Sequence, residues 1–581
     1  MSSLLRQHRF VRLWLWLFAA LLPAVSSGIQ PLRVVGTGGR IGNTFYTPAA
    51  GNTSFRQRTP HKLGGPVSEI RIGFMDWMYP YDAETPNDTN NVTIEHAWLE
   101  RASTGQVVPL AFSGSRQLVL PMNSTTAYWL SDAIPSSVWT GATPARDEVF
   151  WLHVHGTVPE GGKLPVGTPS TYSGAKFIAY SPANDPGTFD TGGPVPTIAG
   201  SAARTLGLPL VFLGRFTGPG HLSVIGIGDS ILDGTGDPAN PVPVISGYGF
   251  FNRAAVDSNG ANTIAMFNVT RHGQAASNFV NLSRQKRQSK FLPFANVVVE
   301  EYGTNDLGSA GGGSPATILG NLNTIWSTAR AAGVQKIVRT LLLPRTASSD
   351  SWATLANQTP NTGWEAGGKR DTINAGLQTA LANGKIDVLL DTPSILADPT
   401  DRSRWLTNGT IKYMNVDEAH VSPAGNALLA PHLRAALVAL KVDDYAAWSA
   451  GKTWGTADPS PAADPNSDGI NNLLAYALDL PPTGSVPTGN LPHGEIDSIT
   501  PDGPWMTFTY RENSAAADLG YSIQTSSDLA EWTTLTINGS TAISEVVNAD
   551  PDGDGSCVLR RVRVLAPVSD PPRFLRLRVN R

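Results

Sequence analysis

Residues 224–237 read VIGIGDSILDGTGD, and the expected organisation of the chain follows from this segment. Its β-branched run ends at Gly228, Asp229 and Ser230, which predicts a buried strand that stops in a glycine-rich turn. Open α/β sheets bind ligands beyond the carboxyl ends of their strands, so this turn can carry a functional serine. Gly-Asp-Ser also occurs in ordinary turns, where Asp and Ser side chains bond to nearby backbone. A chemical role for Ser230 therefore depends on what accompanies it elsewhere in the chain.

The region around this turn alternates strand-like and helix-like segments. Expected strands lie at 222–228, 264–269, 296–301, 336–343 and 386–390, and expected helices at 275–287, 316–332, 369–383 and 423–440. Such alternation predicts a parallel sheet with helices on both faces. The strands are apolar throughout rather than at every second residue, which agrees with burial on both sides.

Two further polar segments stand at the same kind of junction. EYGTND at 301–306 follows an expected strand, and DEAHVSPAG at 417–425 opens the last expected helix. Because the carboxyl ends of parallel strands meet at one edge of a sheet, these segments and Ser230 are expected to converge. The sequence therefore predicts one site built from three distant segments.

These motifs resemble those of the SGNH hydrolases, the GDSL-type esterase and lipase superfamily, over residues 222–440. The four marks of that superfamily stand in order: Gly228-Asp229-Ser230, then Gly273, then Gly303-Thr304-Asn305-Asp306, then Asp417 with His420. Each mark occurs in unrelated proteins, whereas all four in sequence are specific. The resemblance implies an α/β fold, a flavodoxin-like three-layer catalytic domain with a parallel sheet at 216–445.

The resemblance also implies a role for each of these residues. Ser230 is the nucleophile, His420 its general base and later general acid, and Asp417 the group that orients the imidazole. The backbone N–H groups of Ser230 and Gly273 and the side-chain amide of Asn305 form the oxyanion hole. No cofactor is expected for catalysis.

The letters DEAH at 417–420 also spell a helicase motif. A helicase requires an upstream phosphate loop with two glycines before Lys-Thr. The nearest candidate, Gly451-Lys452-Thr453, lies downstream and has Ala446 where the first glycine belongs. We therefore set the helicase reading aside.

The first 27 residues have the composition of a signal peptide. Arg6, Arg9 and Arg12 precede the apolar run 13–22, and Ala24-Val25-Ser26 provides small residues for cleavage. The run is too short to span a bilayer, so we expect a secreted, cell-surface or periplasmic protein without a membrane span. Loss of the three arginines takes the formal net charge from −4 to −7, which argues against a nucleic-acid partner.

Residues 28–215 have a strand-like texture. Short β-rich runs at 70–74, 92–99, 117–120, 148–154 and 176–180 are separated by Gly, Pro, Asn and Asp clusters. Such spacing predicts an N-terminal accessory β-sandwich. It resembles the β-domain that precedes the catalytic domain in some exported bacterial esterases acting on carbohydrates.

Two alternating sets of side chains in this region allow more than one interpretation. His153 and His155 share a strand face with Trp151, as a metal pair or as packing residues would. Trp77, Tyr79 and Tyr81 alternate likewise, which fits either a sugar-stacking platform or core aromatics. In both cases the packing alternative is favoured.

Residues 446–480 predict a linker that contains a calcium-loop-like motif, followed by a small C-terminal β-domain at 481–581. Candidate oxygen ligands at loop positions 1, 3, 5 and 9 are Asp464, Asn466, Asp468 and Asn472, with Gly469 at position 6. Ala475 replaces the usual bidentate carboxylate, so structural calcium would bind weakly or take a ligand from elsewhere. The segment resembles thrombospondin-type-3-like or dockerin-like loops of exported bacterial enzymes, whose β-modules serve attachment, export or glycan contact.

The single cysteine, Cys557, excludes an internal disulfide, and an unpaired buried thiol is its simplest interpretation. Asp550, Asp552 and Asp554 form either a partial metal site or a plain acidic turn.

The sequence as a whole predicts an exported serine esterase that removes acyl groups, most simply acetyl, from a polysaccharide. Lipase, arylesterase or thioesterase activity on the same site is an alternative, because the pocket shape is not legible in the sequence. A catalytically inactive glycan-binding surface protein is a third reading, against which the complete set Ser230, Asp417, His420 and Asn305 argues.

Overall fold

In a computed structural model, the described residues are 31–79, 84–170, 172–217, 220–237, 248–281, 287–440, 442, 445–450, 452–497, 505–513, 516, 519–538, 542–549, 551–552, 557–564 and 574–580. The signal-peptide prediction for residues 1–27 lies outside them. Residues 31–217 and 221–440 form one compact unit, and residues 441–581 belong to a second. No helix among the described residues has the length and apolarity that a bilayer crossing requires.

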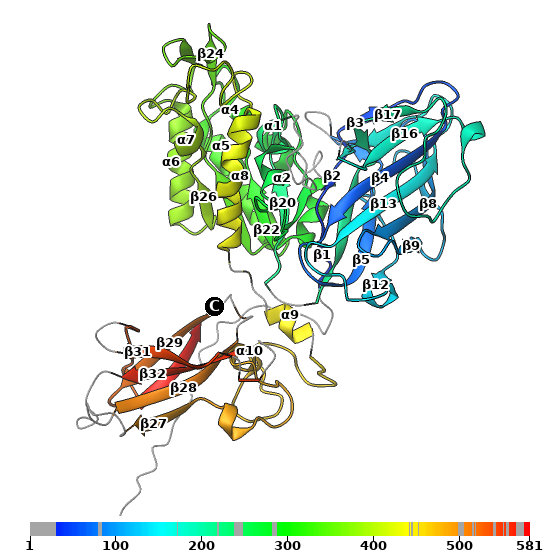
Figure 1. Ribbon diagram of the computed structural model, residues 1–581. Coiled ribbons are helices and arrows are strands. Elements are labelled where there is room, and N and C mark those ends of the chain that lie inside the picture. Colours follow the sequence, from blue (N-terminus) through cyan, green and yellow to red (C-terminus); the bar gives the residue numbers. More distant parts are fainter. Residues whose placement is uncertain are drawn as a thin grey trace, which may run out of the picture. The chain divides into compact units, whose positions relative to one another are not determined.

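The first unit is organised by one continuous sheet (Figure 1). Five neighbouring strands of this sheet run parallel, in the order β21-β20-β22-β23-β26. Their bounds are β20 Ser223–Ile227, β21 Ala265–Asn268, β22 Val297–Glu300, β23 Lys336–Thr340 and β26 Val388–Leu390. Each matches a strand expected from the apolar runs, with ends shortened by at most three residues. Buried on both faces, these strands place their carboxyl ends along one edge.

Helices follow the parallel strands in the expected alternation. Their bounds are α1 Ser230–Asp233, α2 Gly249–Arg253, α3 Ala276–Val280, α4 Thr304–Leu307, α5 Pro315–Ala331, α6 Lys369–Ala382, α7 Thr392–Leu396 and α8 Pro423–Val438. Of these, α5 contacts α3 and α6, whereas α8 contacts α2 and α7. The helix expected at 275–287 is shorter: α3 ends at Val280, residues 282–286 are not described, and a 3-10 helix occupies Gln288–Phe294. Pro293 removes a backbone donor there and disfavours a longer α-helix.

The sheet does not end at the parallel strands. Strand β2 (Gly39–Arg40) pairs in parallel with β21, and β19 (Leu210–Phe216) and β5 (Val67–Phe74) continue antiparallel beyond it. Short strands complete this part: β1 Arg33–Val34, β11 Trp129–Leu130 and β12 Ile134–Pro135. The boundary expected between residues 215 and 216 is thus a change of strand direction within one sheet, not a break between compact units.

A second, antiparallel sheet faces this extension. It contains β4 Ser54–Lys62, β8 Val92–Arg101, β9 Val107–Pro109, β10 Leu118–Leu120, β13 Val149–Thr157, β16 Lys176–Tyr180 and β17 Ala202–Arg204. Phe150 of β13 and Phe212 of β19 lie across the interface with ring centroids 6.4 Å apart. The expected sandwich is therefore two packed sheets, one of which continues into the parallel strands, and one large apolar cluster includes residues from Val34 to Ile386.

The core interpretation favoured for Trp77 and Tyr79 is confirmed, because both side chains are fully buried, and the alternative of a sugar-stacking platform is excluded for these two residues. Trp77 lies in β6 (Trp77–Met78) and its ring stacks against Phe291, with centroids 6.5 Å apart. Tyr81 lies outside the described residues.

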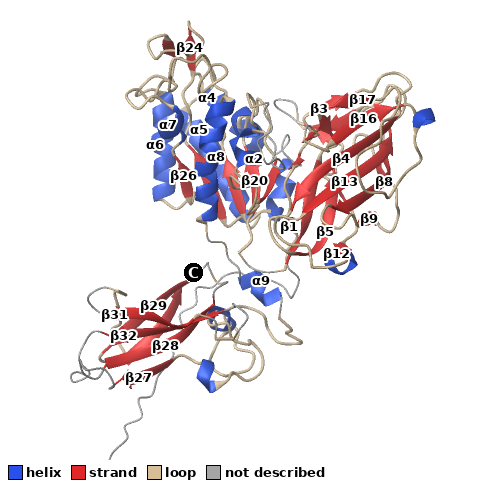
Figure 2. Cartoon of the chain, in the orientation of Figure 1, coloured by secondary structure: helices blue, strands red, loops and turns tan. Residues whose placement is uncertain are grey.

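The second unit is a small β-domain with helices (Figure 2). Its elements are α9 Tyr445–Ala450, α10 Asn472–Ala477, β27 His493–Asp497, β28 Trp505–Asn513, β29 Gly520–Ser526, β30 Thr533–Thr534, β31 Ala542–Asn548, β32 Cys557–Val564 and β33 Phe574–Asn580. Trp448, Leu474 and Tyr476 belong to its buried core. The segment 446–480 is therefore not a free linker, because its apolar residues pack against the β-strands that follow.

Candidate active site

Ser230 lies in the tight turn between β20 and α1, at the sheet edge formed by the carboxyl ends of the parallel strands. β20 ends at Ile227, and α1 begins at Ser230 with Asp229 as its N-cap, whose Oδ1 accepts a hydrogen bond from Ile231 N at 2.9 Å. Gly234 ends the helix with φ 91°, where a Cβ would lie 2.6 Å from Gly249 N. Only glycine fits this close left-handed turn. The turn holds the Ser230 side chain in a site that leaves the residue 6% exposed.

The structure brings Ser230, His420 and Asp417 together in one hydrogen-bonded chain. His420 Nε2 lies 2.7 Å from Ser230 Oγ, and His420 Nδ1 lies 2.8 Å from Asp417 Oδ2. Since a carboxylate can only accept, Nδ1 carries the proton and Nε2 is left to accept the serine hydroxyl. This arrangement can activate a hydroxyl as a nucleophile.

Local sequence explains how Asp417 reaches His420. Asp417 Oδ1 accepts backbone N–H bonds from Ala419 at 3.0 Å and from His420 at 2.9 Å, which folds the four-residue segment 417–420 back on its own carboxylate. Burial acts to raise the pKa of Asp417, but the hydrogen bonds from the His420 ring and from the backbone outweigh burial and hold that pKa well below its usual range. Asp417 therefore remains ionised and can support an imidazolium.

The expected oxyanion donors lie at the ends of three adjacent strands. Gly273 has φ 75° in the loop after β21, and Asn305 is the second residue of α4, after β22. Asn305 Nδ2 donates to the carbonyl of Gln274 at 3.0 Å, so its amide lies beside Gly273. Arg271 N donates to Gly228 O at 3.0 Å and ties this loop to the serine turn. An amide carries two N–H donors, so Asn305 retains one for a substrate oxygen.

His272 borders the site beside His420. The two rings stack with centroids 5.9 Å apart and planes 13° from parallel, and His272 Nδ1 lies 3.2 Å from Thr235 Oγ1. Burial, and then the charge of Arg271, lower the pKa of His272, so this ring is neutral near pH 7. The His272 ring therefore lines the site and does not serve as a second base for Ser230.

The β-rich part of the chain contacts the site directly, which the sequence did not indicate. Arg40 of β2 forms a buried ion pair with Asp233, the last residue of α1. The guanidinium of Arg271 bonds to the carbonyl of Tyr79 and to the side chain of Asn43. No local pattern marks these residues, because their partners lie 192 to 228 positions away in the sequence.

His153 and His155, for which a metal pair was the less favoured alternative, each pair with a carboxylate. His153 Nε2 lies 2.8 Å from Glu100 Oε2, and His155 Nε2 lies 2.9 Å from Asp185 Oδ2. Burial lowers the pKa of each histidine to about 4. On the same face, the Arg58 guanidinium carbon lies 3.6 Å from the centroid of the Trp151 ring. The packing interpretation holds here.

The predicted calcium loop places Asp464, Asn466 and Asp468 in a short turn ahead of α10 and Asn472 as the first residue of that helix. Asp464 accepts from the backbone of Asp468 and Gly469, and Asn466 Nδ2 lies 2.8 Å from Asp468 Oδ2. The side-chain carbonyls of Asn466 and of the fully buried Asn472 have no hydrogen-bond partner among the described residues. Oxygen atoms left without donors are the kind of ligand that Ca²⁺ takes, so the residues present fit the ion.

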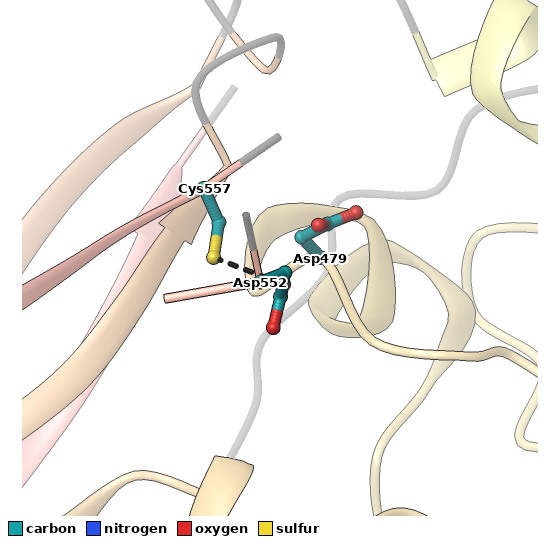
Figure 3. A group of neighbouring side chains, drawn as sticks. All are labelled: Asp479, Asp552 and Cys557. Carbon is teal, nitrogen blue, oxygen red and sulfur yellow. Dashed lines mark hydrogen bonds between the residues drawn. The ribbon is translucent and has the colours of Figure 1, made fainter. Parts of the chain in front are cut away.

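Cys557 is buried in the second unit, next to Asp479 and Asp552 (Figure 3). Its Sγ lies 3.4 Å from Asp552 Oδ2, and the Arg511 guanidinium bonds both oxygens of Asp552. Burial raises the pKa of the thiol to about 12. Arginine already neutralises Asp552, so the cluster is an internal ion pair with a thiol beside it. Asp550 and Asp554 lie outside the described residues.

No protein-family model and no curated protein sequence matches the chain. Among solved structures it is similar to an acetylxylan esterase from Geobacillus stearothermophilus, with 15% identity over 39% of this chain and 97% of that one, at TM-score 0.25. It is also similar to a family two carbohydrate esterase from Clostridium thermocellum in complex with cellohexaose, with 10% identity, 69% and 93% coverage and TM-score 0.26. A third similar structure is an aryl esterase of M. smegmatis, with 15% identity, 38% and 99% coverage and TM-score 0.26. GDSL-type lipases and acylhydrolases are among the other matches, and TM-scores of this size do not decide fold or function.

Proposed function

We propose that this protein is a serine esterase whose nucleophile is Ser230. The observation that carries the proposal is the hydrogen-bonded chain from Ser230 Oγ through His420 to Asp417, at 2.7 Å and 2.8 Å. In a serine hydrolase this geometry lets the imidazole take the hydroxyl proton as the oxygen attacks a carbonyl carbon.

The remaining residues fit the two steps of acyl transfer. Ser230 Oγ bonds to the acyl carbon, and the negative charge on the carbonyl oxygen is met by the N–H groups of Ser230, Gly273 and Asn305. His420 then protonates the departing alcohol, leaving an acyl-enzyme. A water molecule that His420 deprotonates hydrolyses this ester and restores Ser230. No step requires a metal or an organic cofactor.

The strand order supports the flavodoxin-like assignment. Numbered along the chain, the five parallel strands lie in the order 2-1-3-4-5, the order of flavodoxin-like doubly wound sheets. In such sheets the ligand site lies where the order reverses, between strands 1 and 3, and here these are β20 and β22. Ser230 and Asn305 follow those two strands.

We assign the substrate to acylated polysaccharide, with acetyl as the acyl group, and the location to the outside of the cell. The expected signal peptide and the β-rich segments that accompany the hydrolase region support this assignment. Attachment to a glycan or to the cell surface would be a task for the β-domains.

Acetate release from acetylated xylan and other acetylated polysaccharides, measured beside short-chain and long-chain p-nitrophenyl esters, tests the proposal. The wild type should release acetate, and Ser230→Ala should abolish both turnover and covalent labelling by a fluorophosphonate. Ser277→Ala is the matched control, a serine-to-alanine change at an exposed position of α3. Retained activity in Ser230→Ala would overturn the site. Preference for long-chain esters would instead favour a lipase, and glycan binding without turnover an inactive binding protein.

We further propose that the loop 464–472 binds a structural calcium ion through Asp464, Asn466, Asp468 and Asn472. The two partnerless amide oxygens support this, because an ion would satisfy both of them. Calcium at a hundredfold excess over its dissociation constant should stabilise the second unit by about 2.7 kcal/mol, and EDTA should remove the gain. Asp464→Ala should lose the response, whereas Glu495→Ala, an exposed carboxylate on β27, should keep it. Equal unfolding with calcium and with EDTA would refute the proposal.

A further inference from the structure

Two carboxyl groups are buried together beneath the serine turn. Asp229, which directly precedes Ser230, is 0% exposed, and Glu301, which follows β22, is 3% exposed. Asp229 N donates to Glu301 Oε2 at 3.3 Å. Gly228 permits this approach, because a Cβ at that position would lie 3.2 Å from Glu301 Oε2.

If Asp229 and Glu301 are both ionised, one carboxylate oxygen of Asp229 has no hydrogen-bond donor. Its Oδ1 accepts from Ile231 N, but its Oδ2 is buried with no hydrogen-bond partner among the described residues. Two neighbouring carboxylates in a buried site cannot both hold a charge without a large cost. A proton on Glu301 removes the repulsion and supplies the missing donor.

The charged groups that face the pair do not remove the need for this proton. They are His420 from the loop before α8, Asp306 from α4 and Arg339 from β23. Arg339 is already committed to Glu300, with its Nε 3.1 Å from Glu300 Oε2. Asp306 accepts from the backbone N–H groups of Ala276 and Ser277 and supplies no positive charge.

We propose that Glu301 is a positioning residue that holds the Ser230 turn as a neutral carboxylic acid. Its O–H donates to Asp229, while its Oε2 accepts from Asp229 N. Asp229 then keeps the single charge of the pair and fixes the start of α1 through Ile231 N. The role rests on the proposed function, because it is the nucleophile that the turn presents.

The titration behaviour of the pair agrees with this geometry. Burial, followed by the neighbouring charge of Asp229, raises the pKa of Glu301 well above its usual range. Burial also raises the pKa of Asp229, to about 6, although the hydrogen bond from Glu301 lowers that pKa in part. A group whose pKa is raised on folding contributes stability at low pH and loses it as pH rises through the raised value. Ionisation of Glu301 as the pH rises through this raised pKa should therefore loosen the serine turn.

The test compares Glu301→Gln with Glu301→Ala in the full chain. The glutamine amide can still donate to Asp229 but cannot ionise, whereas alanine leaves Asp229 without a donor. The control Glu418→Gln neutralises a carboxylate beside the triad without touching the pair. The readouts are the rate of fluorophosphonate labelling of Ser230 from pH 6 to 10 and thermal unfolding over the same range.

Glu301→Gln should label at pH 7 within a few-fold of the wild type and should lack the wild-type decline at alkaline pH. Glu301→Ala should label about tenfold or more slowly at every pH, as expected for loss of a hydrogen bond to a charged group. Glu418→Gln should keep the wild-type pH profile. Equal losses in Glu301→Gln and Glu301→Ala, or a wild-type alkaline decline in Glu301→Gln, would overturn the proposal.

If the wild type does not label at Ser230 at all, the proposed function fails, and the unfolding data decide the role of Glu301 separately. Alkaline destabilisation that Glu301→Gln abolishes supports the neutral acid. An unfolding profile that Glu301→Gln does not change refutes it.

Discussion

The ion pair between Arg40 and Asp233 makes the β-rich part of the chain a structural support of the serine turn. Arg40 is 6% exposed and Asp233 7%, so neither charge is well solvated. Asp233 also accepts from Thr270 Oγ1 at 2.9 Å. Arg40→Met removes the cation while keeping most of the side-chain volume, and it leaves Asp233 buried without its counter-ion.

Breaking a buried ion pair by removing one partner costs about 3–5 kcal/mol, because an uncompensated charge remains. The Thr270 hydrogen bond survives here, so we expect Arg40→Met to lie near the lower end, at about 3 kcal/mol. Asp233→Asn likewise leaves Arg40 buried without its counter-ion. The double variant should cost less than the sum of the two single variants by about 1.5 kcal/mol or more, because no lone charge is left.

Pulse proteolysis in urea measures this, since the surviving fragments report the unfolding of residues 31–440 separately from residues 441–581. Fluorophosphonate labelling of Ser230 should slow in Arg40→Met, because Asp233 ends the helix that Ser230 begins. Arg402→Met is the matched control, since the ion pair of Arg402 with Asp391 is exposed and should contribute within about 1 kcal/mol. Stability losses of Arg40→Met and Asp233→Asn that add within about 0.5 kcal/mol would refute the coupling.

Three further outcomes are expected. Asn305→Ala should lower kcat about 10²–10³-fold with little change in KM, in steady-state kinetics on a p-nitrophenyl ester; an unchanged kcat would remove Asn305 from the oxyanion hole. Burial raises the pKa of Asp76 to about 8, so its protonated form stabilises the fold at acidic pH and this contribution is lost as pH rises toward 8; Asp76→Asn should flatten the fall in urea stability between pH 5.5 and 8, and an unchanged slope would contradict this. Cys557, with its pKa raised to about 12, should resist thiol reagents at pH 8 until urea unfolds the second unit, and rapid labelling of the native protein would show that the thiol is accessible.

The secondary structure around the site was readable because each element leaves a local pattern. Largely apolar runs of five to eight residues marked all five parallel strands, and Pro423 with Ser422 marked the start of α8. The segment 446–480, in contrast, was wrongly predicted to be a linker. Its Gly, Pro and Asp content is typical of linkers, and the packing of Ile470 and Leu474 against strands far along the chain outweighs that composition.

The sequence by itself determined which residues the candidate site contains and in what order. Asp417 and His420 are three positions apart, and Gly228 precedes Ser230 in one turn, so short-range geometry nearly dictates their contacts. Tertiary structure alone decided that β2 pairs with β21, that Arg40 meets Asp233, and that Glu301 lies under Asp229. These contacts join segments 72 to 228 positions apart, and such contacts leave no periodicity or spacing in the sequence. They arise when the sheet closes and buried charges must find partners within it.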